Sequence, residues 1–385
     1  MNTFQKIWLK FFPKPAEPLP AGTYHFQAPP DAPVSYRMHL RLEKDGIGML
    51  ILNASTILHL NQSAAEYIYY LIQSKSAAEV AQLVSNRYHI SLEQAQQDYQ
   101  DICERLNTLI HTPDLDPVTF LGMERLEPYS AELSAPYRLD CALTYKINQE
   151  TPHAAPVERV KRELLTKEWC TILNKAWEAG IPHIIFTGGE PTLRNDLHEL
   201  IAHAEMNGQV TGLLTDGLRL ADNEYLHELL EKGLDHVMII LDTQDEQAWE
   251  GLRDVLAEDI AVTVHVTIMP GNGLRIPEIL EKLAEMGVTH ISLSASEKGL
   301  KDVLATAQQK VADLHMTLVW DLPVPYSAFN PVAMEQEEAE TTVQGAGKAW
   351  LYVEPDGDVL PSQGDSTKIL GNLLTDPWQK IWSNR

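Results

Sequence analysis

The sequence predicts an α/β protein whose largest part is built on a parallel sheet, as a barrel or as a doubly wound sheet. Strand-like apolar runs alternate with helix-periodic segments six times between residues 138 and 295. The links between them are short, and strands joined through a helix run parallel. Glycines also follow several expected helices, where a left-handed cap residue is favoured: Gly180, Gly208, Gly233 and Gly287.

The composition is that of a folded, soluble chain. Of its 385 residues, 44% are apolar and 22% are charged, and the length suggests two or three domains. The formal net charge of −24 would repel a phosphate backbone, so we expect no nucleic-acid partner. No apolar run approaches the roughly 20 residues of a membrane span. Few cysteines and the absence of a cleavable signal favour the cytoplasm.

We expect residues 1–32 to form an N-terminal helix and a linker. Aromatic and aliphatic residues within 4–12 fall on one face of a helix, with lysines beside them. The preferred interpretation is a helix docked on its own protein, and the alternative is peripheral contact with an anionic membrane. Proline and alanine dominate residues 15–35, which predicts the linker.

Residues 33–111 predict a compact module of strands followed by three helices. The strands fall between Tyr36 and Leu60, with a turn at Lys44-Asp45-Gly46. We expect the edge at Tyr36–Leu42 to be open for strand addition. A hydroxyl residue followed three residues later by Glu or Gln precedes each expected helix, as in a capping box: Ser63 with Glu66, Ser76 with Glu79, and Ser91 with Gln94.

A second linker is expected over 112–136, followed by the alternating region over 137–325 and a C-terminal domain over 326–385. The last domain contains a predicted hairpin at 349–363, with Pro355-Asp356-Gly357-Asp358 as its turn, and Trp378 and Trp382 as core anchors. In the alternating region the expected strands are 138–147, 182–187, 209–215, 235–242, 260–269 and 288–295.

The segment FTGGEP, residues 186–191, is the strongest indication of a binding site. It directly follows the second expected strand, at the end of the sheet where such folds bind ligands. Gly188 and Gly189 allow close approach to the backbone, and the Glu190 carboxylate suits an ammonium group. The alternative is a tight turn with a solvated glutamate.

With LTYK at 143–146 and LLTDG at 213–217, this segment resembles the radical S-adenosylmethionine (SAM) superfamily. Residues 36–110 resemble the small PqqD-like peptide-binding protein of pyrroloquinoline-quinone biosynthesis, a winged helix-turn-helix. The tail, YVEPDGDVLP and LGNLLTDPW, is similar to the auxiliary-cluster (SPASM or Twitch) domain of peptide-modifying, PqqE-like members. The resemblance covers roughly nine-tenths of the chain in the family's usual order.

The resemblance implies a partial (β/α)6 barrel of the TIM type. It also implies a four-iron cluster on a C-x3-C-x2-C loop after the first strand, but Ile147, Thr151 and Ala154 stand at those three positions. Ser362 stands at the auxiliary-cluster cysteine of the tail. These side chains cannot replace thiolates, and a nearby His153 could supply only one ligand. We therefore expect no iron–sulfur cluster and no other metal.

The SAM positions implied by the resemblance are only partly kept. Relatives often read Ser-Leu-Asp at the end of the fourth strand, where this chain has Ile240 before Leu241-Asp242, so we expect weak SAM binding at most. No catalytic residue can be assigned. The cofactor-binding candidates are Gly188, Gly189, Glu190, Pro191, Thr215, Asp216 and Asp242.

Three functions remain open at this stage. The first is a non-radical relative, or pseudoenzyme, that binds a precursor peptide or a partner maturation enzyme, with 33–111 either binding the peptide or serving as an intrachain docking domain. The second is an enzyme that uses SAM or a nucleoside in polar chemistry. The third is a radical SAM protein by fold only, whose cysteines were lost naturally or removed deliberately.

Overall fold

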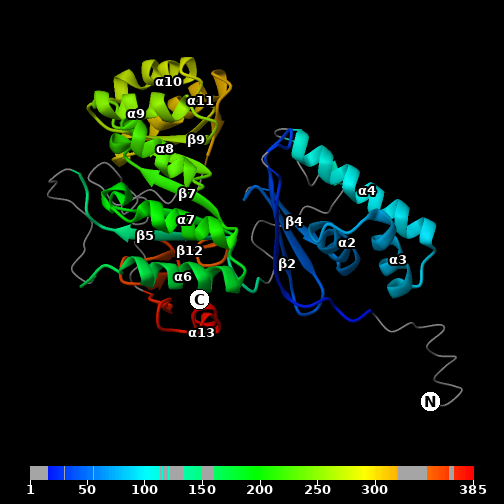
Figure 1. Cartoon of the computed structure of the whole chain (residues 1–385). Helices are drawn as coiled ribbons and strands as arrows, with labels where there is room; N and C mark the ends of the chain where they lie inside the picture. The colour runs from blue at the N-terminus through cyan, green and yellow to red at the C-terminus, as the bar shows by residue number, and fades with distance from the viewer. Residues whose placement is uncertain are drawn as a thin grey trace, which may run out of the picture. The chain divides into compact units, whose positions relative to one another are not determined.

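The computed structural model describes residues 16–29, 31–54, 56–112, 115, 120–121, 133–148, 160–319, 345–363 and 368–385. The expected helix at 4–12 lies outside these ranges. The chain divides into two compact units, Met1–Glu127 and Pro128–Arg385 (Figure 1). Within the described ranges, no helix is long and apolar enough to cross a membrane.

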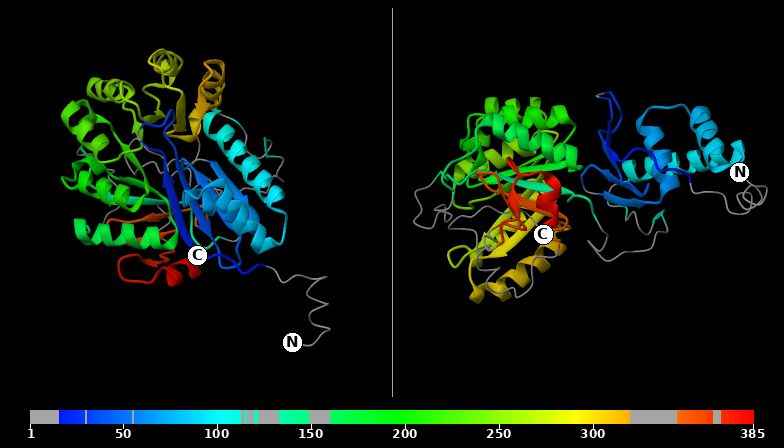
Figure 2. Two further views of the ribbon diagram at one scale, coloured as in Figure 1. Left: turned by 45° about the vertical axis from the view of Figure 1, so that its right-hand side comes forward. Right: turned by 90° about the horizontal axis from the view of Figure 1, so that it is seen from below.

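The first unit is an antiparallel four-stranded sheet followed by three helices (Figure 2, blue to cyan). Each strand pairs with the next along the chain, in the order β1-β2-β3-β4. Gly46 takes the positive φ of 89° that the predicted turn before β3 requires. The elements are β1 (Gly22–Gln27), β2 (Arg37–Leu42), β3 (Gly48–Leu52), β4 (Thr56–Leu60), α2 (Gln62–Ile72), α3 (Ala77–Tyr88) and α4 (Leu92–His111).

The strand β1 corrects two expectations. It lies inside the segment predicted as a linker, and it pairs with β2 along the whole length from Gly22 opposite Leu42 to Gln27 opposite Arg37. The expectation of an open edge at Tyr36–Leu42 was therefore wrong. Tyr24 and Phe26 explain the strand, because both pack against the core on the helix side of the sheet. The outer edges left in this sheet belong to β1 and β4.

The three predicted helices are present, but only one has a complete capping box. Ser76 and Glu79 cap α3 reciprocally. At α4, Ser91 accepts from the Gln94 N–H, whereas the Gln94 side chain donates to Asp98.

At α2 the predicted cap was wrong. Asn61 begins that helix by accepting from the Ala64 N–H at 2.9 Å. Glu66 cannot complete a box with Ser63, because its carboxylate is buried in an ion pair with Arg87 at 2.7 Å.

The second unit confirms the predicted α/β class. Its six expected strands lie side by side and parallel in chain order, and β11 (Thr317–Leu318) adds a short seventh. The four glycines expected after helices all have positive φ. The six strands are β5 (Arg138–Thr144), β6 (His183–Gly188), β7 (Val210–Thr215), β8 (His236–Ile240), β9 (Ala261–Ile268) and β10 (His290–Ala295).

Helices cover one face of this sheet and build the main core with it (Figure 1). Fully buried aliphatic residues from β5 to β10 point into this layer, together with Trp169. The opposite face is more polar and includes the buried His265 of β9, which bonds to Ser292 and Ser294 of β10. The helices are α6 (Thr166–Ala179), α7 (Leu197–Asn207), α8 (Asn223–Glu231), α9 (Glu246–Leu256), α10 (Ile276–Glu285) and α11 (Lys301–Asp313).

The predicted C-terminal hairpin is formed by β12 (Trp350–Val353) and β13 (Asp358–Leu360), with β14 (Gly371–Asn372) beside it. It is not separate from the barrel sheet, because β12 pairs parallel with β5. The predicted anchors lie on α13 (Trp378–Ser383), where the two indole rings stack at 5.4 Å. Both indole N–H groups donate to backbone carbonyls, of Ser134 and Leu133.

Candidate functional site

The loop after β6 lies directly against the backbone that follows β5. The Gly189 N–H donates to the Thr144 carbonyl at 2.7 Å, and the Glu190 N–H donates to the Lys146 carbonyl at 2.7 Å. A Cβ at Gly188 would lie 2.1 Å from the Thr144 oxygen, and one at Gly189 would lie 2.2 Å from the Lys146 oxygen. The close approach that these glycines allow is thus to the chain's own backbone.

Glu190 joins the carboxyl ends of β6 and β7. Its side chain is 2% exposed. Oε1 accepts from the Thr192 N–H at 2.9 Å, the Thr192 hydroxyl at 2.5 Å and the Thr215 hydroxyl at 2.8 Å. Oε2 accepts from the Asp216 N–H at 2.7 Å. The carboxylate therefore fixes the two strand ends, and a ligand would share it with these four donors.

Burial, and after it the negative charge of Asp216, raise the pKa of Glu190 to about 8, although the hydrogen bonds from Asp216 and Thr192 act to lower it. A buried carboxyl group beside a second, half-buried one favours either a proton or a bound cation. The electrostatics of this site therefore suit a ligand ammonium group, whereas its accessibility is low.

Asp216 brings a third strand into the site. Its Oδ2 accepts from the side chain of Asn148, in the segment after β5, at 2.7 Å, and its Oδ1 accepts from the Leu218 N–H. Pro191 is buried at the first position of a short 3-10 helix. Asp242, after β8, accepts from the Gln244 N–H of its own loop. Of the candidates, the structure brings Glu190, Thr215 and Asp216 together, and the two glycines directly precede Glu190 in the same loop.

The first cluster position is described and the next two are not. Ile147 follows β5 and is half-buried. Thr151, His153 and Ala154 lie outside the described residues. Ser362 is 9% exposed and follows β13. Neither the isoleucine nor the serine side chain is a ligand for soft iron.

The three cysteines of the chain do not form an alternative ligand set by their chemistry. Cys141 is fully buried in β5, Cys170 is half-buried in α6, and Cys103 belongs to α4 of the other unit. Burial raises the pKa of all three thiols. Iron is held by thiolates, which such environments disfavour. Within the part of the chain that the structure describes, the side chains near the end of β5 do not fit a four-iron cluster.

Three residues near this edge of the sheet were missed by sequence reasoning. The Tyr145 hydroxyl donates to the fully buried Glu354 carboxylate at 2.6 Å. Glu163 accepts from the Thr144 hydroxyl at 2.5 Å. Glu354 lies after β12, so only the pairing of β12 with β5 brings it here. The sequence segment YVEPDGDVLP, which contains Glu354, does not indicate that pairing.

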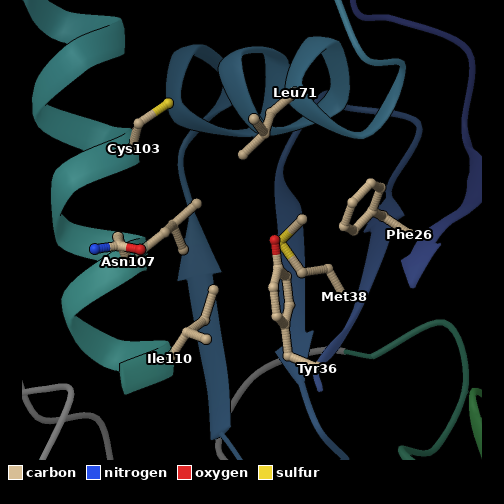
Figure 3. A pocket seen from close by; sticks show the side chains of 8 residues that line it. Phe26, Tyr36, Met38, Leu71, Cys103, Asn107 and Ile110 are labelled. Atoms are coloured by element: carbon tan, nitrogen blue, oxygen red, sulfur yellow. The ribbon is translucent and has the colours of Figure 1, made fainter. Parts of the chain in front are cut away.

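The first unit contains an apolar cavity of about 150 Å³ between its sheet and its helices (Figure 3). Phe26, Tyr36 and Met38 line it from the strand side, and Leu71 closes one end. The residues from α4 are Cys103, Leu106, Asn107 and Ile110.

Comparison with known families gives a match within the barrel. Residues 141–261 match the radical SAM superfamily. Two proteins named PqqA peptide cyclase are similar in sequence. The one from Streptomyces rochei is 28% identical over 281 residues, which cover 65% of this chain and 76% of that protein. The one from Granulibacter bethesdensis is 26% identical over 285 residues, covering 65% and 73%.

Comparison with solved structures extends the fold likeness to nearly the whole chain. The structure of Streptococcus suis SuiB bound to precursor peptide SuiA covers 89% of this chain and 86% of that one, with a TM-score of 0.54 and 14% identity. The structure of SuiB bound to S-adenosylmethionine has a TM-score of 0.53 over 90% of this chain and 86% of that one, at 14% identity. The chain is thus similar in sequence to radical SAM proteins, among them two named PqqA peptide cyclase, and similar in fold to SuiB.

Proposed function

We propose that this radical SAM relative binds a peptide destined for modification, or the enzyme that modifies it, and carries no iron–sulfur cluster. One observation carries the proposal. The segment after β5, where the family's cluster loop begins, has Ile147 instead of a cysteine, and burial raises the pKa of the three thiols of the chain, which lie on β5, α6 and α4. Of the parts that the family uses, the chain keeps the barrel and the expected peptide-recognition module over residues 33–111.

The peptide part of the proposal rests on the relatives. The sequence relatives are named for the peptide PqqA, and SuiB was solved with its precursor peptide. We assign the first unit, with its four strands and three helices, as a PqqD-like module, and the segment from β12 to β14 as a SPASM-like domain. We place the protein in the cytoplasm, where its cysteines stay reduced.

Anaerobic reconstitution with iron and sulfide tests the missing cluster. We expect no bound iron and no visible cluster absorption in the natural chain. The matched control is the triple variant Ile147→Cys, Thr151→Cys, Ala154→Cys, which restores the C-x3-C-x2-C spacing and should take up iron. Stoichiometric cluster iron in the natural chain would overturn the proposal.

A second candidate function, binding of SAM or a nucleoside for polar chemistry, is favoured by Glu190 and Asp216. Their shared negative charge suits the ammonium group of SAM, because that cation would relieve the raised pKa of Glu190. Calorimetry with SAM on the natural chain and on Glu190→Gln tests it. We expect weak binding that the substitution removes, and tight binding that survives it would place the ligand elsewhere.

Peptide binding is tested with synthetic peptides that correspond to short reading frames beside the gene. We expect one of them to bind the full chain with micromolar or better affinity in fluorescence polarisation, as an extended segment on a sheet edge does. If none binds while a neighbouring maturation enzyme co-purifies with the chain, the partner is the enzyme and the peptide role fails.

A further inference from the structure

We propose that β1 is an exchangeable strand. Residues 22–27 fill the position alongside β2, here called the edge position, until an extended segment of a partner polypeptide replaces them. The inference rests on the proposed peptide binding and names its place and its recognition pattern. It differs from addition to a free edge, because the edge position is already filled by this chain.

The first support is how weakly β1 is held. All six of its residues are exposed or half-buried, whereas five of the six residues of β2 and all five of β3 are buried. Along the ladder, β1 is held to β2 by the antiparallel backbone pairing and by the His25 ring, which stacks on His39 of β2 at 6.3 Å. Any extended segment can make the backbone bonds regardless of its sequence.

The second support is the pattern of side chains that the edge position accepts. Tyr24 and Phe26, two residues apart, point to the helix side. The Tyr24 ring meets Tyr69 of α2 edge-on at 4.8 Å, and the Phe26 ring lies 5.8 Å from Tyr36. A replacing strand therefore gains most from aromatic residues at alternate positions, as in the sequence Tyr-x-Phe.

The third support is the cavity beside Phe26. Its volume of about 150 Å³ is similar to that of cavities that bind benzene. Its eight lining residues carry no charge. A partner strand with a larger apolar side chain at the Phe26 position, or with one more residue in the ladder, would fill space that β1 leaves empty (Figure 3).

The fourth support is the link between β1 and β2. Residues 28–36 contain three prolines and are joined at their ends by the bond from the Ala28 N–H to the Tyr36 carbonyl at 2.9 Å. Such a tether keeps β1 near the edge position at an effective concentration in the millimolar range. β1 therefore excludes weak competitors and gives way only to a segment that binds better.

The first experiment uses the full chain with a protease site inserted after Asp31, and a fluorescent synthetic peptide of residues 17–29. Before cleavage the tethered strand competes, and we expect weak binding of the peptide. After cleavage the apparent affinity of the peptide should rise by about 100-fold, because β1 no longer competes at a millimolar effective concentration. Equal affinity before and after cleavage would overturn the proposal.

The same substitution, made once in the protein and once in the synthetic peptide, makes the test specific. Phe26→Ala in the uncut chain loosens β1 and should strengthen binding of the natural peptide by about tenfold. The same change in the peptide should weaken its binding by a similar factor. Gln27→Ala, at an exposed position, is the control and should change neither. Effects of the same sign on both molecules would contradict competition for one position.

A disulfide between β1 and β2 keeps the test valid if the cleaved chain fails to fold. The bond from Ala28 to Tyr36 makes that pair a hydrogen-bonded one, so Gln27 and Arg37 form the next, non-bonded pair. Cα atoms of such pairs lie about 4.5 Å apart, within reach of a disulfide. The oxidised variant Gln27→Cys, Arg37→Cys should bind no peptide, and reduction should restore binding.

Binding that is equal in the oxidised and reduced forms would show that peptides add to the outer edge of β1, and exchange would be wrong. The outcomes separate this inference from the proposed function. If the peptide of residues 17–29 exchanges but no peptide encoded beside the gene binds, exchange stands and the proposed function fails. If a peptide encoded beside the gene binds the oxidised, disulfide-linked variant, the proposed function stands and strand exchange is wrong.

Discussion

The two sheets of the molecule differ in how their margins are packed. At the carboxyl ends of β5, β6 and β7, polar groups bond to each other, and both oxygens of Glu190 accept hydrogen bonds from the chain itself. At the edge of the antiparallel sheet, β1 has no buried residue and borders a cavity. The first arrangement is closed and fixed, whereas the second leaves apolar surface that another strand could cover better.

The largest effect should come from disturbing the closed region. Gly189→Ala places a methyl group about 2.2 Å from the Lys146 carbonyl oxygen, and backbone cannot easily move away. We expect a loss of about 3 kcal/mol or more in unfolding free energy. Urea unfolding followed by tryptophan fluorescence measures it, because seven of the eight tryptophans lie after residue 128. Gly271→Ala has no atom within 4 Å and should change little.

The charge of the closed region should appear in its pH dependence. Because the folded pKa of Glu190 is raised to about 8, the folded chain holds a proton that the unfolded chain loses near pH 4.5. This group's stabilisation is complete below pH 4.5 and is lost as the pH rises to 8, by up to about 1.4 kcal/mol per pH unit. Glu190→Gln should remove this slope between pH 5.5 and 7.5. Glu178→Gln, at an exposed position, should retain it.

A pair of cysteine substitutions compares packing in the two regions directly. Cys141 is fully buried in the barrel core, so Cys141→Leu should cost about 1–3 kcal/mol through overpacking. Cys103 lines the cavity, so Cys103→Leu should be neutral or stabilise by about 0.5–1 kcal/mol. Calorimetric unfolding of both variants measures the difference. The same sign in both would mean that the cavity collapses in solution and that the contrast is false.

The smallest expected effect concerns the helix caps of the first unit. Ser76→Ala breaks the complete capping box of α3 and should cost about 1 kcal/mol. Ser63→Ala should cost almost nothing, because Asn61 caps α2. Thermal unfolding followed by circular dichroism would show the difference. An equal cost at both sites would indicate that Ser63 contributes to the α2 terminus after all.

The alternation of strands and helices could be predicted because each element shows its own periodicity and short links force parallel pairing. The six strands of the barrel therefore appear within a few residues of their predicted bounds. β1 was missed for a compositional reason. The prolines and alanines on both sides of GTYHFQ indicate a linker, and the alternation of Tyr24 and Phe26 is too short to outweigh them.

The candidate site was predictable only as a set of loops. Phe186–Pro191 stands at the end of a strand in the sequence as in the structure. What the sequence could not show is that Gly189 faces the β5 backbone and that Glu190 is occupied by four donors. Those contacts depend on how neighbouring strands are offset, which no local pattern encodes. Glu354 was invisible for the same reason, since its place depends on β12 pairing with β5.

The pairing of β12 with β5 has a consequence during synthesis. Trp350 lies opposite Arg138, so more than 200 residues separate the two strands in the chain. At ribosomal speeds of about 5–20 residues per second, β12 is synthesised on the order of 10 to 40 seconds after β5. Throughout that interval the nascent barrel exposes an unpaired row of amides and carbonyls. Chaperone binding to this row is therefore expected on the ribosome, and release of the chain before residue 350 should yield aggregates.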